Sequence, residues 1–338
     1  MKKTLISVIC FALAACVLFC GCVKGDNEPD AASVTETAPA CTDAPAVTEA
    51  PAATETAPAA EHIDPYSIEN GYDADSSLFA KQEGVDYGTV VSGLTYCSTV
   101  AGEDKRCCVL LPAGFDEGGA YPVMYVIHGF NGGPEDLIYK NSYLVTLYGN
   151  MLARGLAVPM IIVAVDMYTG PAAEKNDKNG AELKECYNKV IEEIAADLMP
   201  FIEAAYPVSA SREDTAVAGV SEGAGKALCI GFTHPEEFGW IGAFSPNAGV
   251  IPTEFDEGTF WNDPVMQDFP ELTEDETPLY LYLAVGSEDT GSMGPTLYYR
   301  DVLNERGIMN QTDLVEGFDH NTRFWRQCFC NFLSKVFK

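Results

Sequence analysis

One serine in the chain occupies the pattern that turns a hydroxyl group into a nucleophile. The segment Gly219-Val220-Ser221-Glu222-Gly223 has the form G-x-S-x-G. It follows a short apolar run and precedes residues that suit a helix, as a nucleophile elbow requires. A serine on such a turn can attack an ester carbonyl once a neighbouring base takes its proton. The pattern therefore predicts acyl-transfer chemistry at Ser221.

The base can be sought by elimination, because the chain has only four histidines. His62 borders a low-complexity segment, His128 lies in a turn after a predicted strand, and His234 precedes a proline. His320 remains, between a short strand-like segment and the final predicted helix. We predict that His320 deprotonates Ser221.

The acid should follow the strand that precedes the histidine, since this type of site has the chain order serine, acid, histidine. The predicted strand 279–285 ends in Gly286-Ser287-Glu288-Asp289. We predict that Asp289 orients the imidazole and stabilises its protonated form. Glu288, the preceding residue, is the alternative acid.

A tetrahedral intermediate needs two backbone N–H groups to stabilise its oxyanion. We predict that the residue after the nucleophile, Glu222, supplies one of them. The other is expected from the loop His128-Gly129-Phe130-Asn131-Gly132-Gly133, whose glycines let the backbone approach a ligand. Phe130 is the predicted donor in this loop.

The segment 252–278 is acidic, rich in proline and aromatic residues, and has no clear periodicity. Such a long irregular segment between predicted strands is typical of an insertion that shapes a substrate groove. The candidate substrate-binding residues are Trp261 in this segment, Asn131 in the glycine-rich loop, and Trp325 shortly after His320.

These residues must be positioned by a sheet, because short apolar segments alternate with helical patterns. The strand-like segments are 87–97, 106–111, 122–127, 160–165, 215–220, 241–244 and 279–285, and the helix-like segments are 182–206, 296–306 and 322–337. Almost wholly apolar runs indicate buried parallel strands, and the first two segments indicate an antiparallel opening. The pattern predicts a doubly wound α/β fold that binds ligands beyond the carboxyl ends of its strands.

The chain begins with the features of an export signal. Met1-Lys2-Lys3 precede an uncharged apolar run from Leu5 to Phe19, the layout of a secretory signal rather than of a membrane span. We predict a lipoprotein-type signal over residues 1–22 with the lipid on Cys22, Cys16 being the alternative. The mature protein would then be anchored on the extracellular side of a bacterial membrane, although ordinary cleavage with full release is also compatible with these residues.

Residues 23–62 consist almost entirely of Ala, Thr, Glu and Pro. This composition cannot build a core, so we expect an extended spacer. Residues 63–338 suit one α/β domain, which contains 42 of the 50 acidic residues in a chain of net charge −30. Such a surface repels nucleic acid and anionic lipid headgroups but not a neutral polysaccharide, although acidity can also serve solubility alone.

No cofactor is required by the chemistry predicted above. The seven cysteines beyond residue 62 include no C-x-x-C spacing and no cluster with histidine. We therefore predict no metal site. Their odd number argues against a disulfide framework, and we expect most of them to be buried as small apolar side chains.

Together these motifs resemble the carbohydrate-esterase family of feruloyl and acetylxylan esterases, which is related to esterase D and S-formylglutathione hydrolases in the α/β-hydrolase superfamily. The resemblance covers most of residues 88–338. It rests on His128-Gly129 with Gly132-Gly133, the elbow at Ser221, His234-Pro235-Glu236-Glu237-Phe238 leading to Gly242-Ala243-Phe244-Ser245, Gly286 with Asp289, and His320 followed by Trp325. The chain departs from the family at Glu222, where Met is frequent, at Asn131, where a small residue is common, and at Thr322, where an aromatic residue is common.

The resemblance implies an α/β-hydrolase fold and a serine esterase that removes feruloyl or acetyl groups from a plant cell-wall polysaccharide such as xylan. Two alternatives remain open at this point. The first is an esterase for another ester or thioester, such as a siderophore or a thioester like S-formylglutathione. The second is a non-catalytic surface protein that binds glycans on the same scaffold.

Overall fold

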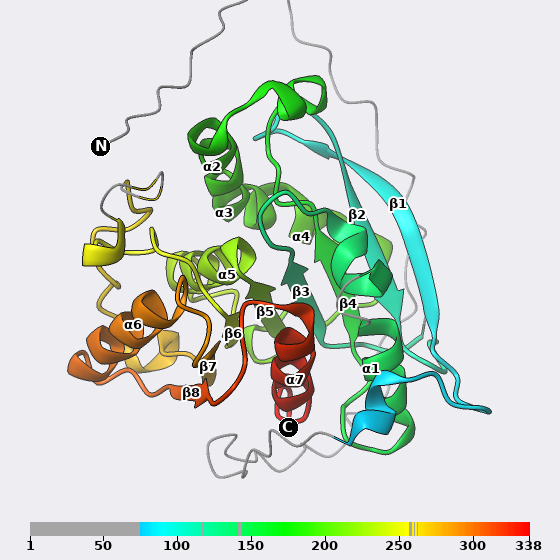
Figure 1. Ribbon diagram of the computed structural model, residues 1–338. Coiled ribbons are helices and arrows are strands. Elements are labelled where there is room, and N and C mark those ends of the chain that lie inside the picture. The colour runs from blue at the N-terminus through cyan, green and yellow to red at the C-terminus, as the bar shows by residue number, and fades with distance from the viewer. Residues whose placement is uncertain (1–74, 117, 141–143, 257–258, 260, 262) are drawn as a thin grey trace, which may run out of the picture. The chain divides into compact units, whose positions relative to one another are not determined.

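An eight-stranded sheet organises the part of the chain that the structure describes. The structure is a computed structural model, and it describes residues 75–338 except 117, 141–143, 257–258, 260 and 262. The strand order is β1-β2-β4-β3-β5-β6-β7-β8 (Figure 1). The strands are β1 (Thr89–Ser98), β2 (Glu103–Leu111), β3 (Val123–Ile127), β4 (Ile161–Val165), β5 (Thr215–Val220), β6 (Trp240–Phe244), β7 (Tyr280–Gly286) and β8 (Gln311–Val315).

The α-helices lie between most of the parallel strands, except between β6 and β7, and the last helix follows β8. They are α1 (Leu144–Ala153), α2 (Gly180–Asn188), α3 (Val190–Glu193), α4 (Met199–Ala205), α5 (Glu222–Thr233), α6 (Met293–Glu305) and α7 (Thr322–Leu333). Strands β3 to β8 pair in parallel with one another, whereas β1 is antiparallel to β2 and β2 is antiparallel to β4. The predicted mostly parallel sheet with antiparallel N-terminal strands is therefore confirmed.

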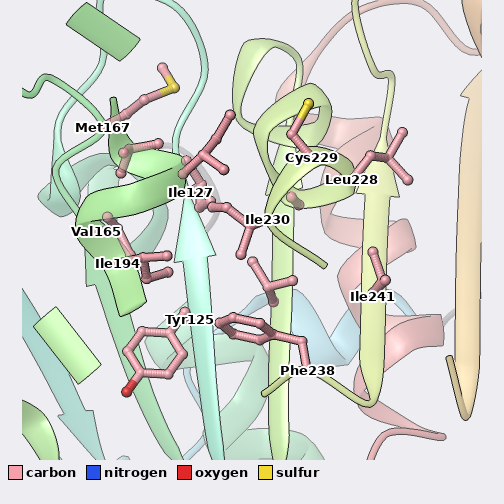
Figure 2. Close-up of a cluster of buried hydrophobic side chains, with 14 of the residues drawn as sticks. Tyr125, Ile127, Val165, Met167, Ile194, Leu228, Cys229, Ile230, Phe238 and Ile241 are labelled. Atoms are coloured by element: carbon pink, nitrogen blue, oxygen red, sulfur yellow. The ribbon is translucent and has the colours of Figure 1, made fainter. Parts of the chain in front are cut away.

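The two faces of the sheet are covered by different helices. Alternate residues of a strand point to opposite faces, so Tyr125 of β3 packs in the core with residues of α2 to α6, while Met124 packs in the core with residues of α1 and α7. Figure 2 shows part of the first core, in which Tyr125 lies beside Phe238 with 6.1 Å between ring centroids. Full burial of such side chains stabilises the fold by roughly 1.5–3 kcal/mol each.

The helix predicted over 182–206 is interrupted in the structure. It is divided into α2, α3, a π-helical turn at Ile194–Leu198, and α4. The N–H of Met199 donates to the carbonyl of Ile194, five residues back. Pro200 follows and has no N–H to donate, so an α-helical bond is missing at this point, and the π turn absorbs the change. The apolar periodicity thus predicts the helical segment, but it does not encode the break at Ile194–Leu198.

The export signal predicted over residues 1–22, including Cys16 and Cys22, and the spacer over 23–62 lie outside the described residues. Among the described helices, none is long and apolar enough to cross a membrane. Cys97 is disulfide-bonded. The other described cysteines are free and buried, as expected of small apolar side chains: Cys107, Cys108, Cys186, Cys229, Cys328 and Cys330.

Candidate active site

Ser221 lies at a sharp turn between β5 and α5. Its φ angle is +56°, a conformation that is strained for a residue with a side chain. The N–H of Ser221 donates to the carbonyl of Phe244 at 2.9 Å, which ties the turn to β6. A Cβ atom at Gly223 would lie 2.3 Å from the carbonyl oxygens of Ile127 and His128. Only glycine allows the elbow to pack directly against the end of β3, beside the glycine-rich loop.

Three side chains from separate loops meet in one hydrogen-bonded row. The Nε2 atom of His320 lies 2.9 Å from the hydroxyl oxygen of Ser221. Its Nδ1 atom lies 2.7 Å from a carboxylate oxygen of Asp289. These residues follow β5, β7 and β8, so the structure brings all three to the carboxyl edge of the sheet. Glu288, the alternative acid, is exposed, whereas Asp289 is buried.

The carboxylate of Asp289 is held in its ionised form. Burial raises its pKa, but hydrogen bonds from His320 and Ser245 and from the backbone of Ser292 outweigh burial and leave the pKa below the ordinary value. The N–H of Ser292 donates to the second carboxylate oxygen at 3.0 Å. An ionised, fixed carboxylate can orient the imidazole ring and stabilise its positive charge.

Ser245 is a supporting residue to which the sequence analysis gave no role. It follows β6, is fully buried, and has a φ angle of +55°. Its hydroxyl oxygen accepts a hydrogen bond from the indole N–H of Trp325 at 3.3 Å. The indole ring also meets His320 edge on, with 5.0 Å between centroids. The sequence signal that could have identified Ser245 is its position directly after β6, the strand beside β5. Ligand-facing residues gather at the carboxyl ends of such strands.

The glycine-rich loop after β3 is fixed by His128. The Nε2 atom of this ring accepts a hydrogen bond from the N–H of Met167 at 3.1 Å. A neutral ring then carries its proton on Nδ1, which lies 2.7 Å from the carbonyl oxygen of Gly129 and donates to it. The carbonyl of Gly129 and the N–H of Phe130 belong to one trans peptide and point in opposite directions. The Phe130 N–H therefore points away from His128, as an oxyanion donor in this loop requires.

The side chain of Glu222 is occupied by other partners. It is 1 % exposed, and one carboxylate oxygen lies 2.9 Å from the ammonium group of Lys226. The other oxygen accepts a hydrogen bond from the indole of Trp261 at 2.7 Å. The carboxylate thus forms a buried ion pair within α5 and anchors segment 252–278. The ammonium group of Lys226 thus neutralises the charge of this carboxylate. The predicted oxyanion donor is a different group, the backbone N–H of Glu222.

A cavity of about 330 Å³ adjoins Ser221. Its lining combines rings and apolar side chains with a few polar groups: His128, Gly129, Phe130, Gly132, Asp136, Leu137, Val220, Ser221, His320 and Trp325. Among the predicted substrate-binding residues, Trp325 lines this cavity, and Trp261 and Asn131 do not. The side chain of Asn131 is exposed, and its backbone N–H donates to the hydroxyl of Tyr187 at 3.2 Å.

The donor set of this site is that of acyl transfer. Within the described ranges, no three His, Cys, Asp or Glu side chains are grouped so that they could hold a metal ion. The imidazole of His320 lies within hydrogen-bond distance of both the Ser221 hydroxyl and the Asp289 carboxylate, the geometry that activates a serine.

Comparisons with known proteins agree with this chemistry. A family model described as "Putative esterase" matches residues 98–329. The endo-1,4-beta-xylanase/feruloyl esterase of Xylanibacter ruminicola is 22% identical over 271 residues, which cover 78% of this chain and 33% of that protein. The chain thus spans about a third of the length of this curated relative.

Solved structures show the same fold. A CE1 ferulic acid esterase of the anaerobic fungus Anaeromyces mucronatus superimposes with a TM-score of 0.70 at 29% identity, covering 80% of this chain and 98% of that one. Its complex with ferulic acid gives a TM-score of 0.70 at 28% identity over the same shares. The family model covers more than half of the chain, and the fold is that of the α/β-hydrolases. The protein therefore belongs to this esterase family of carboxylic ester hydrolases.

Proposed function

We propose that this protein is a serine esterase that removes feruloyl groups from a plant cell-wall polysaccharide such as xylan. The observation that carries the proposal is the row formed by Ser221, His320 and Asp289, with distances of 2.9 and 2.7 Å between successive partners. The relatives that are named feruloyl or ferulic acid esterases support the acyl group.

The reaction begins with attack of the Ser221 hydroxyl oxygen on the ester carbonyl. The Nε2 atom of His320 accepts the serine proton, and Asp289 stabilises the imidazolium that forms. The negative charge on the carbonyl oxygen is stabilised by the backbone N–H groups of Glu222 and Phe130. When the intermediate collapses, the C–O bond to the sugar breaks and the imidazolium protonates the departing alcohol. Ser221 then carries the acyl group.

Water completes the cycle. His320 removes a proton from a water molecule, whose oxygen attacks the acyl-enzyme carbonyl. The same two N–H groups stabilise the second tetrahedral intermediate. Its collapse breaks the bond to Ser221, which regains its proton from His320, and releases the free acid. No external electron donor or acceptor takes part in either half of the reaction.

The cavity beside Ser221 favours an aromatic acyl group over acetyl. Its volume of about 330 Å³ is far larger than an acetyl group fills. Phe130, Leu137 and Trp325 line it. A mostly apolar and aromatic lining with a few polar groups is typical of small-molecule sites, and it suits an aromatic ring. Acetyl esters on the same polymer remain the second candidate substrate.

The proposal is tested by assaying purified protein on feruloylated and acetylated xylan oligomers of matched length. We expect a higher kcat/KM for the feruloyl ester and no measurable turnover of either ester by Ser221→Ala. Turnover retained by Ser221→Ala would refute the serine mechanism. A clear preference for acetyl oligomers would refute the proposed acyl group while leaving the mechanism intact.

We also propose that the protein acts at the outer surface of a bacterial cell, attached through a lipid on Cys22, with Cys16 as the alternative site. The support is the charged start followed by an apolar run, and the Ala/Thr/Glu/Pro composition of residues 23–62. Detergent partitioning of protein made in its host, with Cys22→Ala and Cys16→Ala as variants, tests this. Loss of partitioning for one variant identifies the site, and aqueous behaviour of the unaltered protein would contradict anchoring.

A further inference from the structure

A second hollow of about 480 Å³ lies on the flank of the domain, between segment 252–278 and α6. We call it the α6 groove. Its lining residues are Ile251, Pro252, Gln267, Asp268, Tyr298, Val302, Glu305 and Arg306. None of them lines the cavity beside Ser221, so the groove is a separate feature.

The groove extends to the C-terminal end of α6, where Glu305 and Arg306 line it. Another hollow of about 490 Å³ shares Arg306 with it and continues between Pro270 and Ile308. The two hollows adjoin at Arg306, the C-cap residue of α6, so together they form a longer depression that passes the C-terminal end of the helix. An elongated, open depression suits a chain molecule better than a compact ligand.

Two exposed aromatic rings lie on α6: Tyr298 lines the groove, and Phe255 lies against Gly294, four residues nearer the start of the helix. Phe255 and Tyr298 are each 39% exposed, although aromatic rings of this size are usually buried. A Cβ atom at Gly294 would lie 2.5 Å from the ring of Phe255, so this ring rests directly on the backbone of α6. Gly294 and Tyr298 are four residues apart and share one face of the helix. The two rings therefore occupy successive positions along that face.

The spacing of these rings fits a polymer. Four residues of α-helix correspond to about 6 Å, comparable to the length of one sugar unit in a chain. The helix begins beside the triad, since Ser292, its N-cap residue, donates its N–H to Asp289 at 3.0 Å. Glu305 lies thirteen residues further on, about 20 Å along the axis. A glycan that carries the scissile ester can thus reach from the triad to the groove.

The polar groups of the groove suit neutral hydroxyl groups. Gln267, Asp268 and Glu305 are exposed and offer one amide and two carboxylates, which can accept hydrogen bonds from sugar hydroxyls. Arg306, the cation in the lining, forms an ion pair with Asp268. The lining therefore has an excess of negative charge and disfavours an anionic polymer. Apolar sugar faces can stack on exposed rings while their hydroxyls bond at the rim.

We propose that the α6 groove is a second carbohydrate-binding site, which holds the neutral backbone of the polysaccharide whose ester is cleaved at Ser221. This rests on the proposed function. Phe255 and Tyr298 are the stacking platforms, and Gln267, Asp268 and Glu305 bond to the hydroxyls. The site contributes affinity for the polymer and takes no part in the chemical step.

The test measures binding and catalysis separately. Binding is measured with the intact chain carrying Ser221→Ala, on insoluble arabinoxylan stripped of its esters. We expect added Tyr298→Ala or Phe255→Ala to weaken binding about tenfold each, and Tyr298→Phe to retain it. Leu156→Ala is the control, since this residue is 41% exposed outside the groove. In the active protein, kcat/KM for methyl ferulate should stay within about twofold for each variant.

The outcomes are distinguishable. Binding that is unchanged by Tyr298→Ala and Phe255→Ala, with methyl ferulate still hydrolysed, would contradict carbohydrate binding in the α6 groove. The proposed function would not be affected. Binding that disappears at high salt would also contradict carbohydrate binding in the groove, because contacts with a neutral glycan are not screened by ions. Failure of the unaltered protein to hydrolyse methyl ferulate would instead count against the proposed function.

Discussion

The carboxyl edge of the sheet and the flank beside α6 are built in opposite ways. At the edge, each polar side chain is fixed by short hydrogen bonds, as Asp289 is by His320 at 2.7 Å and by the N–H of Ser292 at 3.0 Å. On the flank, Phe255 and Tyr298 are exposed. The edge is preorganised for one reaction, whereas the flank offers a surface. We therefore expect the strand ends to set the chemistry and the flank to contribute affinity for the proposed polymer.

The largest effect is expected at the edge, where the two candidate acids can be compared. Asp289→Asn should lower kcat by about 10³- to 10⁴-fold, because the imidazole loses its carboxylate partner. Glu288→Gln, the matched control, should remain within about twofold because Glu288 is exposed. Steady-state kinetics on methyl ferulate compares the two. A larger loss of kcat for Glu288→Gln than for Asp289→Asn would show that Glu288 is the acid that orients His320.

The next effect concerns Glu222, which joins the elbow to the flank. Glu222→Met leaves the buried ammonium group of Lys226 unpaired and removes the acceptor for Trp261, so we expect a loss of about 3 kcal/mol in the free energy of unfolding. The double variant Glu222→Met/Lys226→Met should recover most of this loss, because no buried charge is left unpaired. Urea unfolding curves give both values. Equal stability of the single variant and the unaltered protein would show that the ion pair contributes nothing.

A smaller effect is expected at Ser245, which bonds to Asp289 and Trp325 and does not line the cavity beside Ser221. Ser245→Ala removes one hydrogen bond to Asp289 and the acceptor for Trp325, and should lower kcat about tenfold with KM unchanged. Trp325→Phe, which keeps a ring beside His320, should lower kcat less but raise KM, because Trp325 lines the cavity. A change in KM without a change in kcat for Ser245→Ala would contradict its role in positioning Asp289.

The sheet could be predicted from the sequence because apolar runs report burial directly. Segment 215–220 was expected as a strand and is β5 with the same bounds. The chain order of serine, acid and histidine then indicated which loops meet. Side-chain contacts between residues far apart in the sequence could not be predicted in this way. The hydrogen bond between Glu222 and Trp261 joins residues 39 positions apart, and no local pattern encodes it. The sequence therefore left Trp261 as a candidate for substrate binding, because it could not show that this indole bonds to Glu222.

The central claim is that the Ser221 hydroxyl is activated by His320. The most direct test is covalent labelling with a fluorophosphonate probe, which reacts with activated serines, followed by peptide mass mapping. We expect one adduct, on the peptide that contains Ser221, with labelling at least a hundredfold slower for His320→Ala, roughly the contribution of a positioned base. An adduct on another residue, or equally fast labelling without the imidazole, would contradict the account.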